Sequence, residues 1–141
     1  SGTENVAAIA GMTAAILETS KLRSDEATRL KGLQTELIER LMKQLGTEVQ
    51  GSCDHRLPNN IHVRFPGVDN EYLVMALDER GIMAATGSAC HASSDEPSHV
   101  LRAIGLAEEA MQECVRFSLG RYTTMTSIDT LMSQLTDILQ P

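Results

Sequence analysis

The chain has 141 residues and a formal net charge of −7, with 42% hydrophobic and 22% charged residues. This length fits one domain with a hydrophobic core, and the composition is that of a globular protein rather than a disordered one. The acidic balance argues against nucleic acid or an anionic membrane surface as the main partner. No apolar run approaches the ~20 residues of a membrane span, so we expect no membrane among the partners.

Three cysteines, Cys53, Cys90 and Cys114, form an odd number without the spacing of a disulfide framework. Such usage is typical of a reducing compartment, and we expect a cytoplasmic protein. No signal peptide is visible. The chain begins at Ser1 rather than at a methionine, so we expect either a processed product or a piece of a longer protein.

Helical periodicity dominates the first third of the chain. Apolar residues at helical spacing predict a helix over residues 4–22 and a second over about 25–45, with Ser24 as its N-cap. The two could also form a single long, bent helix. Gly46 stands where a left-handed glycine commonly ends a helix, and a short strand is predicted at 48–50.

Two segments alternate between apolar and polar residues and are predicted as strands. One covers 60–65, with His62 and Arg64 on its outward face, and the other covers 114–119, with Arg116 on its outward face. The remaining predicted elements are a strand at 82–85 and helices at 69–80, 97–104, 107–112 and 125–139. We therefore expect a single α+β domain over 1–141, with a small, mostly antiparallel sheet of three to four strands and helices packed on one face.

A run of small and polar residues surrounds Cys90. Such residues offer little to pack, so we expect the loop from about 86 to 94 to be exposed and to be the least ordered internal segment. Free cysteine is usually buried, and an exposed one is a candidate reactive thiol. The alternative is an ordinary small buried residue.

Arg116 lies on the polar face of a strand that is otherwise small and apolar. It is either a solvated surface arginine or a clamp for a carboxylate, which a planar guanidinium binds through two hydrogen bonds. The three lysines, Lys21, Lys31 and Lys43, all fall in the predicted N-terminal helices and are expected to be solvated.

Sulfur and imidazole side chains raise the possibility of a metal site. The candidates are Cys53, His55, Cys90 and Cys114. Zinc ligands usually come in closely spaced pairs, two to four residues apart for cysteine. Because no such pair of cysteines occurs, we expect no metal, although a metal-binding module stays open as an alternative.

Three stretches together resemble the cysteine desulfurases of the class V aminotransferase group. They are Thr86–Cys90, Glu96–Leu106 and Val115–Thr124, and the similarity runs essentially end to end. The resemblance implies the C-terminal small domain of an enzyme with the type I fold of pyridoxal-phosphate enzymes. In such enzymes the cofactor acts as an electron sink.

The resemblance also implies roles for single residues. The cysteine matching Cys90 attacks the sulfur of L-cysteine as a thiolate and keeps it as a persulfide, while L-alanine leaves. The arginine matching Arg116 holds the substrate carboxylate. The sulfur then passes to acceptor proteins, such as an iron–sulfur scaffold, or to nucleoside thiolation.

One departure from the family limits this reading. The family's cofactor lysine lies in a His-Lys pair of the large domain, and no His-Lys pair occurs here. The resemblance therefore implies that the large domain is absent, that this chain alone binds no pyridoxal phosphate and is inactive, and that the full-length parent is a homodimer. The alternatives are a selenocysteine lyase, a stand-alone thiol or sulfur carrier without cofactor, and the metal-binding module.

Overall fold

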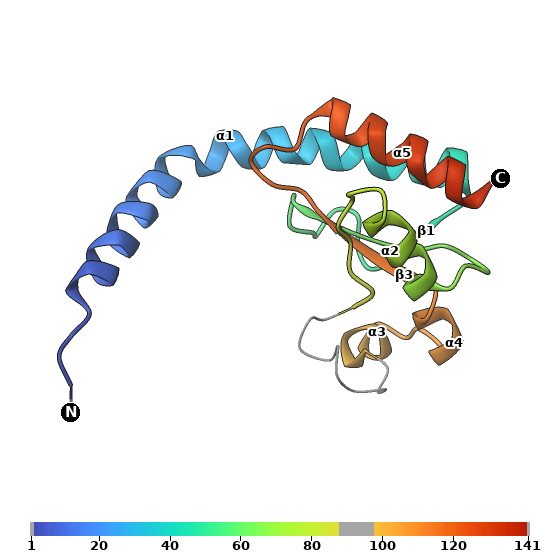
Figure 1. Ribbon diagram of the computed structural model, residues 1–141, viewed down its shortest axis with the longest axis horizontal. Coiled ribbons are helices and arrows are strands. Elements are labelled where there is room, and N and C mark those ends of the chain that lie inside the picture. Colours follow the sequence, from blue (N-terminus) through green and yellow to red (C-terminus); the bar gives the residue numbers. More distant parts are fainter. Residues whose placement is uncertain (1, 88–97, 141) are drawn as a thin grey trace.

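The computed structural model describes residues 2–87 and 98–140, and these form an α+β fold (Figure 1). The fold class and the antiparallel sheet are as predicted, and the strands lie in the order β1-β2-β3. In chain order the elements are α1 (Val6–Leu45), β1 (Glu48–Val49), β2 (Asn60–Arg64), α2 (Asn70–Asp78), α3 (His99–Ala103), α4 (Glu108–Met111), β3 (Cys114–Ser118) and α5 (Met125–Leu139).

The helix α1 is one continuous element and not two. Its N-cap is Asn5, whose side chain accepts from the Ala8 N–H at 3.1 Å, and it ends at Gly46 with φ 65°. Ser24 was predicted to cap a second helix, but it lies inside α1, where its carbonyl accepts from the Thr28 hydroxyl at 3.1 Å. The single bent helix, which the sequence left as a possibility, is therefore the correct reading (Figure 1).

The sheet register places two apolar rows on one face. Ile61 pairs with Phe117 and Val63 with Val115, and all four side chains are buried. The C-terminal half of α1 and the helix α2 pack on this inner face, and α5 packs against these two helices and completes the core. The helix side of the core consists of Leu30, Leu33, Leu37, Ile38, Leu41, Leu73, Ala76, Leu77, Ile128, Leu131, Met132, Leu135 and Ile138.

The predicted strand at 82–85 is wrong. Of the segment 82–85, only Ala85 pairs with a strand among the described residues. It forms two backbone hydrogen bonds with Arg116, of 2.7 and 3.1 Å. The cause lies at the end of α2, where Gly81 has φ 75° and the Ile82 N–H turns back to the Leu77 carbonyl at 2.9 Å. A backbone N–H that closes a helix end in this way is not free to join a ladder.

The outer face of the sheet carries a second, smaller apolar cluster. It consists of Leu101, Met111 and Cys114 and holds the short helices α3 and α4. The helix α3 begins at His99, with Ser98 as its N-cap, two residues later than the predicted start. Cys90 and most of the predicted loop at 86–94 lie outside the described residues.

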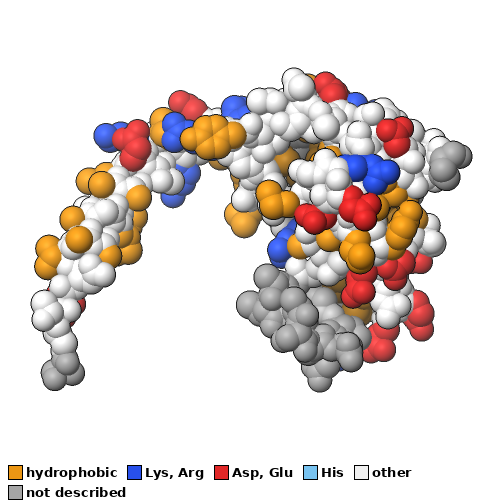
Figure 2. All heavy atoms as spheres, in the orientation of Figure 1, with side chains coloured by type: hydrophobic (Ala, Val, Ile, Leu, Met, Phe, Trp, Pro, Cys, Tyr) orange, Lys and Arg blue, Asp and Glu red, His pale blue; other side chains and the backbone are white. Residues whose placement is uncertain are grey.

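The first half of α1 extends away from the rest of the structure. Residues 2–21 are exposed throughout, and Figure 1 shows this segment, called the arm here, leaving the body of the domain. The arm presents large apolar side chains to solvent (Figure 2), namely Val6, Ile9, Met12, Ile16 and Leu17. Among the described residues no helix has the length and apolar character needed to cross a membrane.

Candidate functional site

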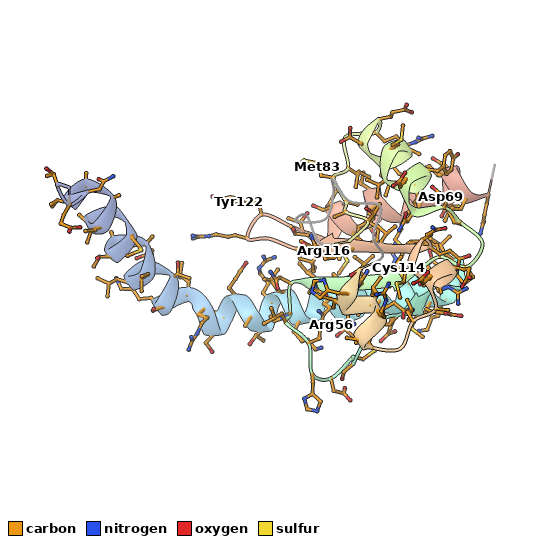
Figure 3. The ribbon with its side chains drawn as sticks, turned by 90° about the horizontal axis from the view of Figure 1, so that it is seen from below. Arg56, Asp69, Met83, Cys114, Arg116 and Tyr122 are labelled. Carbon is orange, nitrogen blue, oxygen red and sulfur yellow. The ribbon has the colours of Figure 1, made fainter. Side chains whose placement is uncertain are left out.

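Arg116 lies at the centre of a pocket on the outer face of the sheet. Its backbone is held on one side by the ladder with β2 and on the other by Ala85. Its half-buried side chain lines a pocket of about 380 Å³, whose other walls are the segment 50–57 and the helix α3. Figure 3 shows Arg116 and Arg56 beside α3. This volume suits a small molecule.

The guanidinium of Arg116 has no acidic partner among the described residues, whereas the next arginine on the same face does. Arg64 donates to Glu113 at 2.6 Å and to Glu48 at 3.0 Å. The Gly67 N–H and the Arg64 guanidinium together lower the pKa of Glu113. Arg64 thus has a structural ion pair on each side, whereas no described residue occupies the donors of the Arg116 guanidinium.

The segment 50–57 is wound around a second arginine. Arg56 donates from Nε to the Ser52 carbonyl at 3.0 Å and from Nη2 to the Gln50 carbonyl. Gly51 makes this winding possible, because its φ of 81° is disfavoured for side-chain-bearing residues and a Cβ there would lie 3.5 Å from Nη2 of Arg56. The two carbonyls fix the plane of the guanidinium against the pocket.

The far end of this segment is anchored by a buried amide of α1. Gln34 donates from Nε2 to the carbonyls of Leu57 and Asn60 at 2.8 and 2.7 Å. Its Oε1 accepts from Lys31 Nζ at 2.9 Å. A buried amide with its donors and acceptor used in this way holds the pocket wall in one conformation.

His62 faces Arg116 directly across the β2–β3 ladder. Burial lowers the pKa of its imidazole from 6.5 to about 4, with further lowering by the nearby charges of Arg56 and Arg116. The ring is therefore neutral at neutral pH. Its Nε2 is buried and has no hydrogen-bond partner in the part of the chain that the structure describes.

Two residues at the rim of the pocket flank the undescribed stretch that contains Cys90. Gly87 is the last described residue before this stretch and Ser98 the first after it, and both line the pocket. The two attachment points of the Cys90 segment therefore lie beside Arg116, and the placement of Cys90 itself is outside the described residues.

The other two cysteines are free thiols in unlike environments. Cys53 is exposed and Cys114 is buried, with its Sγ donating to the Ala110 carbonyl at 3.2 Å. Burial raises the pKa of Cys114 to about 11, so this thiol stays protonated and suits packing rather than metal binding. Within residues 2–87 and 98–140, no three histidine, cysteine or acidic side chains gather as metal ligands.

The lysines do not fit a pyridoxal phosphate site. Lys21 and Lys43 pair with glutamates of their own helix, and Lys31 donates to Gln34 and to the Cys53 carbonyl. None of them lines the Arg116 pocket. The described residues therefore offer no lysine poised for a Schiff base with that cofactor.

Sequence reasoning selected Arg116 but missed Arg56 and His62. A signal for His62 was present, because it and Arg116 were both predicted on the outward faces of their strands. No signal marked Arg56, since its position depends on the winding of 50–57 around it. The structure brings all three together around one pocket.

These features define an α+β domain with a positively charged small-molecule pocket on its sheet. The family description "Aminotransferase class-V" matches residues 1–131, and the chain belongs to the class V aminotransferase family.

Its relatives include cysteine desulfurases from archaea. The chain is 40% identical to "Cysteine desulfurase IscS 1" of Archaeoglobus fulgidus, over 99% of this chain and 37% of that protein. It is 41% identical to "Cysteine desulfurase IscS" of Methanosarcina thermophila, over 99% of this chain and 34% of that protein. A solved NifS-like protein from Rickettsia africae superposes with a TM-score of 0.86 at 28% identity, covering 100% of this chain and 36% of that one. The chain thus spans about a third of the length of these relatives.

Proposed function

We propose that this chain is the C-terminal small domain of a pyridoxal-phosphate-dependent cysteine desulfurase. In this proposal Cys90 takes the sulfur of L-cysteine as a persulfide and L-alanine is released, while Arg116 binds the substrate carboxylate. The observation that carries the proposal is the pocket itself. It presents an arginine without an acidic partner among the described residues, and the segment bearing Cys90 is attached at its rim through Gly87 and Ser98.

Three observations support a role beside a larger domain. The chain spans about a third of its relatives' length, its described lysines are engaged away from the pocket, and the arm presents an apolar stripe to solvent. Contiguous exposed apolar surface commonly marks an interface. We infer that the remaining part of the enzyme covers the arm and holds the cofactor, which supplies an electron sink when bound.

The proposal extends to the cellular context. The sulfur would pass from Cys90 to acceptor proteins such as an iron–sulfur scaffold, and the full enzyme would act as a homodimer. The two described cysteines are free thiols, which suits a reducing compartment such as the cytoplasm.

The test needs the enzyme with its cofactor domain and uses two variants. Cys90→Ser should still bind L-cysteine but form neither persulfide nor alanine, because a hydroxyl is a far poorer nucleophile toward sulfur than a thiolate. Arg116→Ala should weaken L-cysteine binding by about 2–4 kcal/mol, the scale for truncating one partner of a desolvated charge pair. Arg116→Lys should restore only part of this, since an ammonium cannot reproduce the two-pronged contact.

A matched control separates these effects from a general loss of arginine. Arg80 is exposed at the end of α2, where it donates to the Ala76 carbonyl, and Arg80→Ala should leave both substrate binding and alanine yield unchanged. Wild-type alanine yield from Cys90→Ser would disprove the role of that thiol. Unchanged L-cysteine binding in Arg116→Ala would show that Arg116 does not bind the substrate carboxylate and is an ordinary surface arginine.

A further inference from the structure

Three side chains of the pocket have unused hydrogen-bonding capacity. Among the described residues, Nη1 of Arg56 and Nε2 of His62 are buried without a partner. The Arg116 guanidinium has no side-chain hydrogen bond or ion pair with any described residue. Buried polar groups without partners are costly, and two of them beside the half-buried Arg116 guanidinium indicate a ligand that supplies the missing oxygens.

The charge of the pocket specifies the sign of that ligand. Among the described residues, no aspartate or glutamate lines it, although the whole chain has a net charge of −7. Neither Arg56 nor Arg116 takes part in the ion pairs of the described residues, which use other arginines and lysines. Two guanidinium charges therefore face the same space, and no described residue supplies a counter-charge.

The surroundings strengthen the attraction for an anion. Apolar side chains of α3 and of its C-cap residue, namely Val100, Leu101 and Ile104, form one wall of the pocket. A wall of this kind lowers the local dielectric and makes charge-assisted hydrogen bonds stronger. Because Nη1 of Arg56 and Nε2 of His62 are already shielded from solvent, an oxygen that meets them displaces little water.

The geometry of the sheet and of the segment 50–57 fixes how the three groups converge. His62 and Arg116 are directly opposed on antiparallel strands, where Cα atoms lie about 4.5–5.5 Å apart and side chains share one face. Arg56 is held through Nε and Nη2 by the carbonyls of Ser52 and Gln50. Nη1 of Arg56 is therefore available for a ligand. The guanidinium groups of Arg56 and Arg116 are both close enough to His62 to lower the pKa of its imidazole.

We propose that Arg56 and His62 form the second half of the carboxylate site of Arg116, so that one amino-acid carboxylate is held by two guanidinium groups and a neutral imidazole N–H. A carboxylate has two oxygens and about four lone-pair directions, which match this set of donors. The identity of the ligand as the L-cysteine substrate rests on the function proposed above, but carboxylate binding to these three residues does not. Arg56 and His62 act here as positioning residues that set the orientation of the carboxylate.

The test uses the 141-residue chain and acetate as the probe, with sodium chloride at equal ionic strength as the reference. The titration of the His62 ring is followed by nitrogen-detected imidazole NMR. Bound acetate should raise the pKa of His62 by about half a unit or more, because an opposite charge within ~4–6 Å favours the protonated ring. Arg56→Ala and Arg116→Ala should each weaken acetate binding about tenfold, as expected for loss of one charge-assisted contact.

A control variant comes from α3 itself. Arg102 pairs with Glu108 and does not line the pocket, so Arg102→Ala should bind acetate like the unmodified chain. If acetate leaves the His62 titration unchanged, the proposal is wrong. An upward shift that persists in Arg56→Ala, or that Arg102→Ala also abolishes, would overturn it equally.

A second measurement connects the site to turnover in the full enzyme. His62→Phe should raise the KM for L-cysteine with little change in kcat. His62→Gln keeps an N–H donor, so its KM should be close to that of the unmodified enzyme. A structural role alone would not distinguish the two variants in KM. If the enzyme produces no alanine from L-cysteine, the proposed function fails while the acetate result stands. If the enzyme is active but acetate does not bind to the chain, the proposed site of Arg56, His62 and Arg116 is wrong while the proposed function stands.

Discussion

The neutral His62 should make the stability of the domain depend on pH in a defined window. Its pKa is lowered from 6.5 to about 4 by burial and by the charges of Arg56 and Arg116. Below pH 6.5 the unfolded chain takes up a proton at this position, whereas the folded chain does so only near pH 4. The free energy of unfolding should therefore fall as the pH drops from 6.5 to 4, with no contribution from His62 above this window.

The size of this effect follows from the two pKa values. Each pH unit between them corresponds to ~1.4 kcal/mol, and the full interval from 4 to 6.5 to about 3.5 kcal/mol. Because the ring is partly exposed, solvent screening reduces this, and we expect a loss of about 2 kcal/mol near pH 4.5.

Urea unfolding of the chain and of His62→Gln, near pH 7 and near pH 4.5, measures this loss. Glutamine keeps a polar side chain of similar reach but does not titrate, so its protein should lose about 2 kcal/mol less on acidification. Carboxylates such as Glu113, whose pKa is lowered, titrate in both proteins and cancel in the difference. Equal losses in both proteins would refute the reasoning.

Three further substitutions test the fold. Asn70 is buried and donates from Nδ2 to the carbonyls of Met111 and Cys114 at 3.1 and 3.0 Å, so Asn70→Ala should lower the free energy of unfolding by about 1–3 kcal/mol in urea, and a loss below ~0.5 kcal/mol would contradict this role. In the arm, Ile16→Gln should change the stability of this chain by less than ~0.5 kcal/mol, whereas Leu37→Ala in the core should cost about 2–5 kcal/mol. Comparable losses for Ile16 and Leu37 would show that the arm packs against this chain in solution.

Much of the fold could be predicted because the local signals agree with the packing. The alternation in 60–65 and 114–119 matches the two strands whose inner rows form the core. Asp69, at the predicted start of the helix 69–80, caps α2 and accepts from the Tyr72 N–H at 2.8 Å. The helix α1 was divided at Ser24 because serine is a strong capping residue. Local sequence does not distinguish a serine that caps a helix from one that continues it, since neighbouring turns decide the outcome.

The arm shows the limit of amphipathic patterns. Its apolar residues recur at helical spacing, and the helix exists, yet Val6 is 70% exposed and Ile16 is 55% exposed in this chain. Helical periodicity indicates that one face of the helix is apolar and packs against another surface. It does not indicate which surface that is. The covering surface can belong to another part of a longer protein, and the pattern in this chain would be the same.

The net charge of the chain does not set the local charge at the pocket. A net charge of −7 argues against nucleic acid or an anionic membrane surface, but the local balance at the pocket is positive, because Arg56 and Arg116 line it and no described carboxylate does. Long-range repulsion is screened over about 8–10 Å in physiological salt, whereas contact hydrogen bonds in a pocket are screened much less. Arg64 and Arg116 stand on one sheet face with the same formal charge, and only the partners around them separate a structural arginine from one open to a ligand. Telling a structural arginine from one open to a ligand requires the three-dimensional positions of Glu48 and Glu113. The sequence around Arg64 or Arg116 does not indicate these positions.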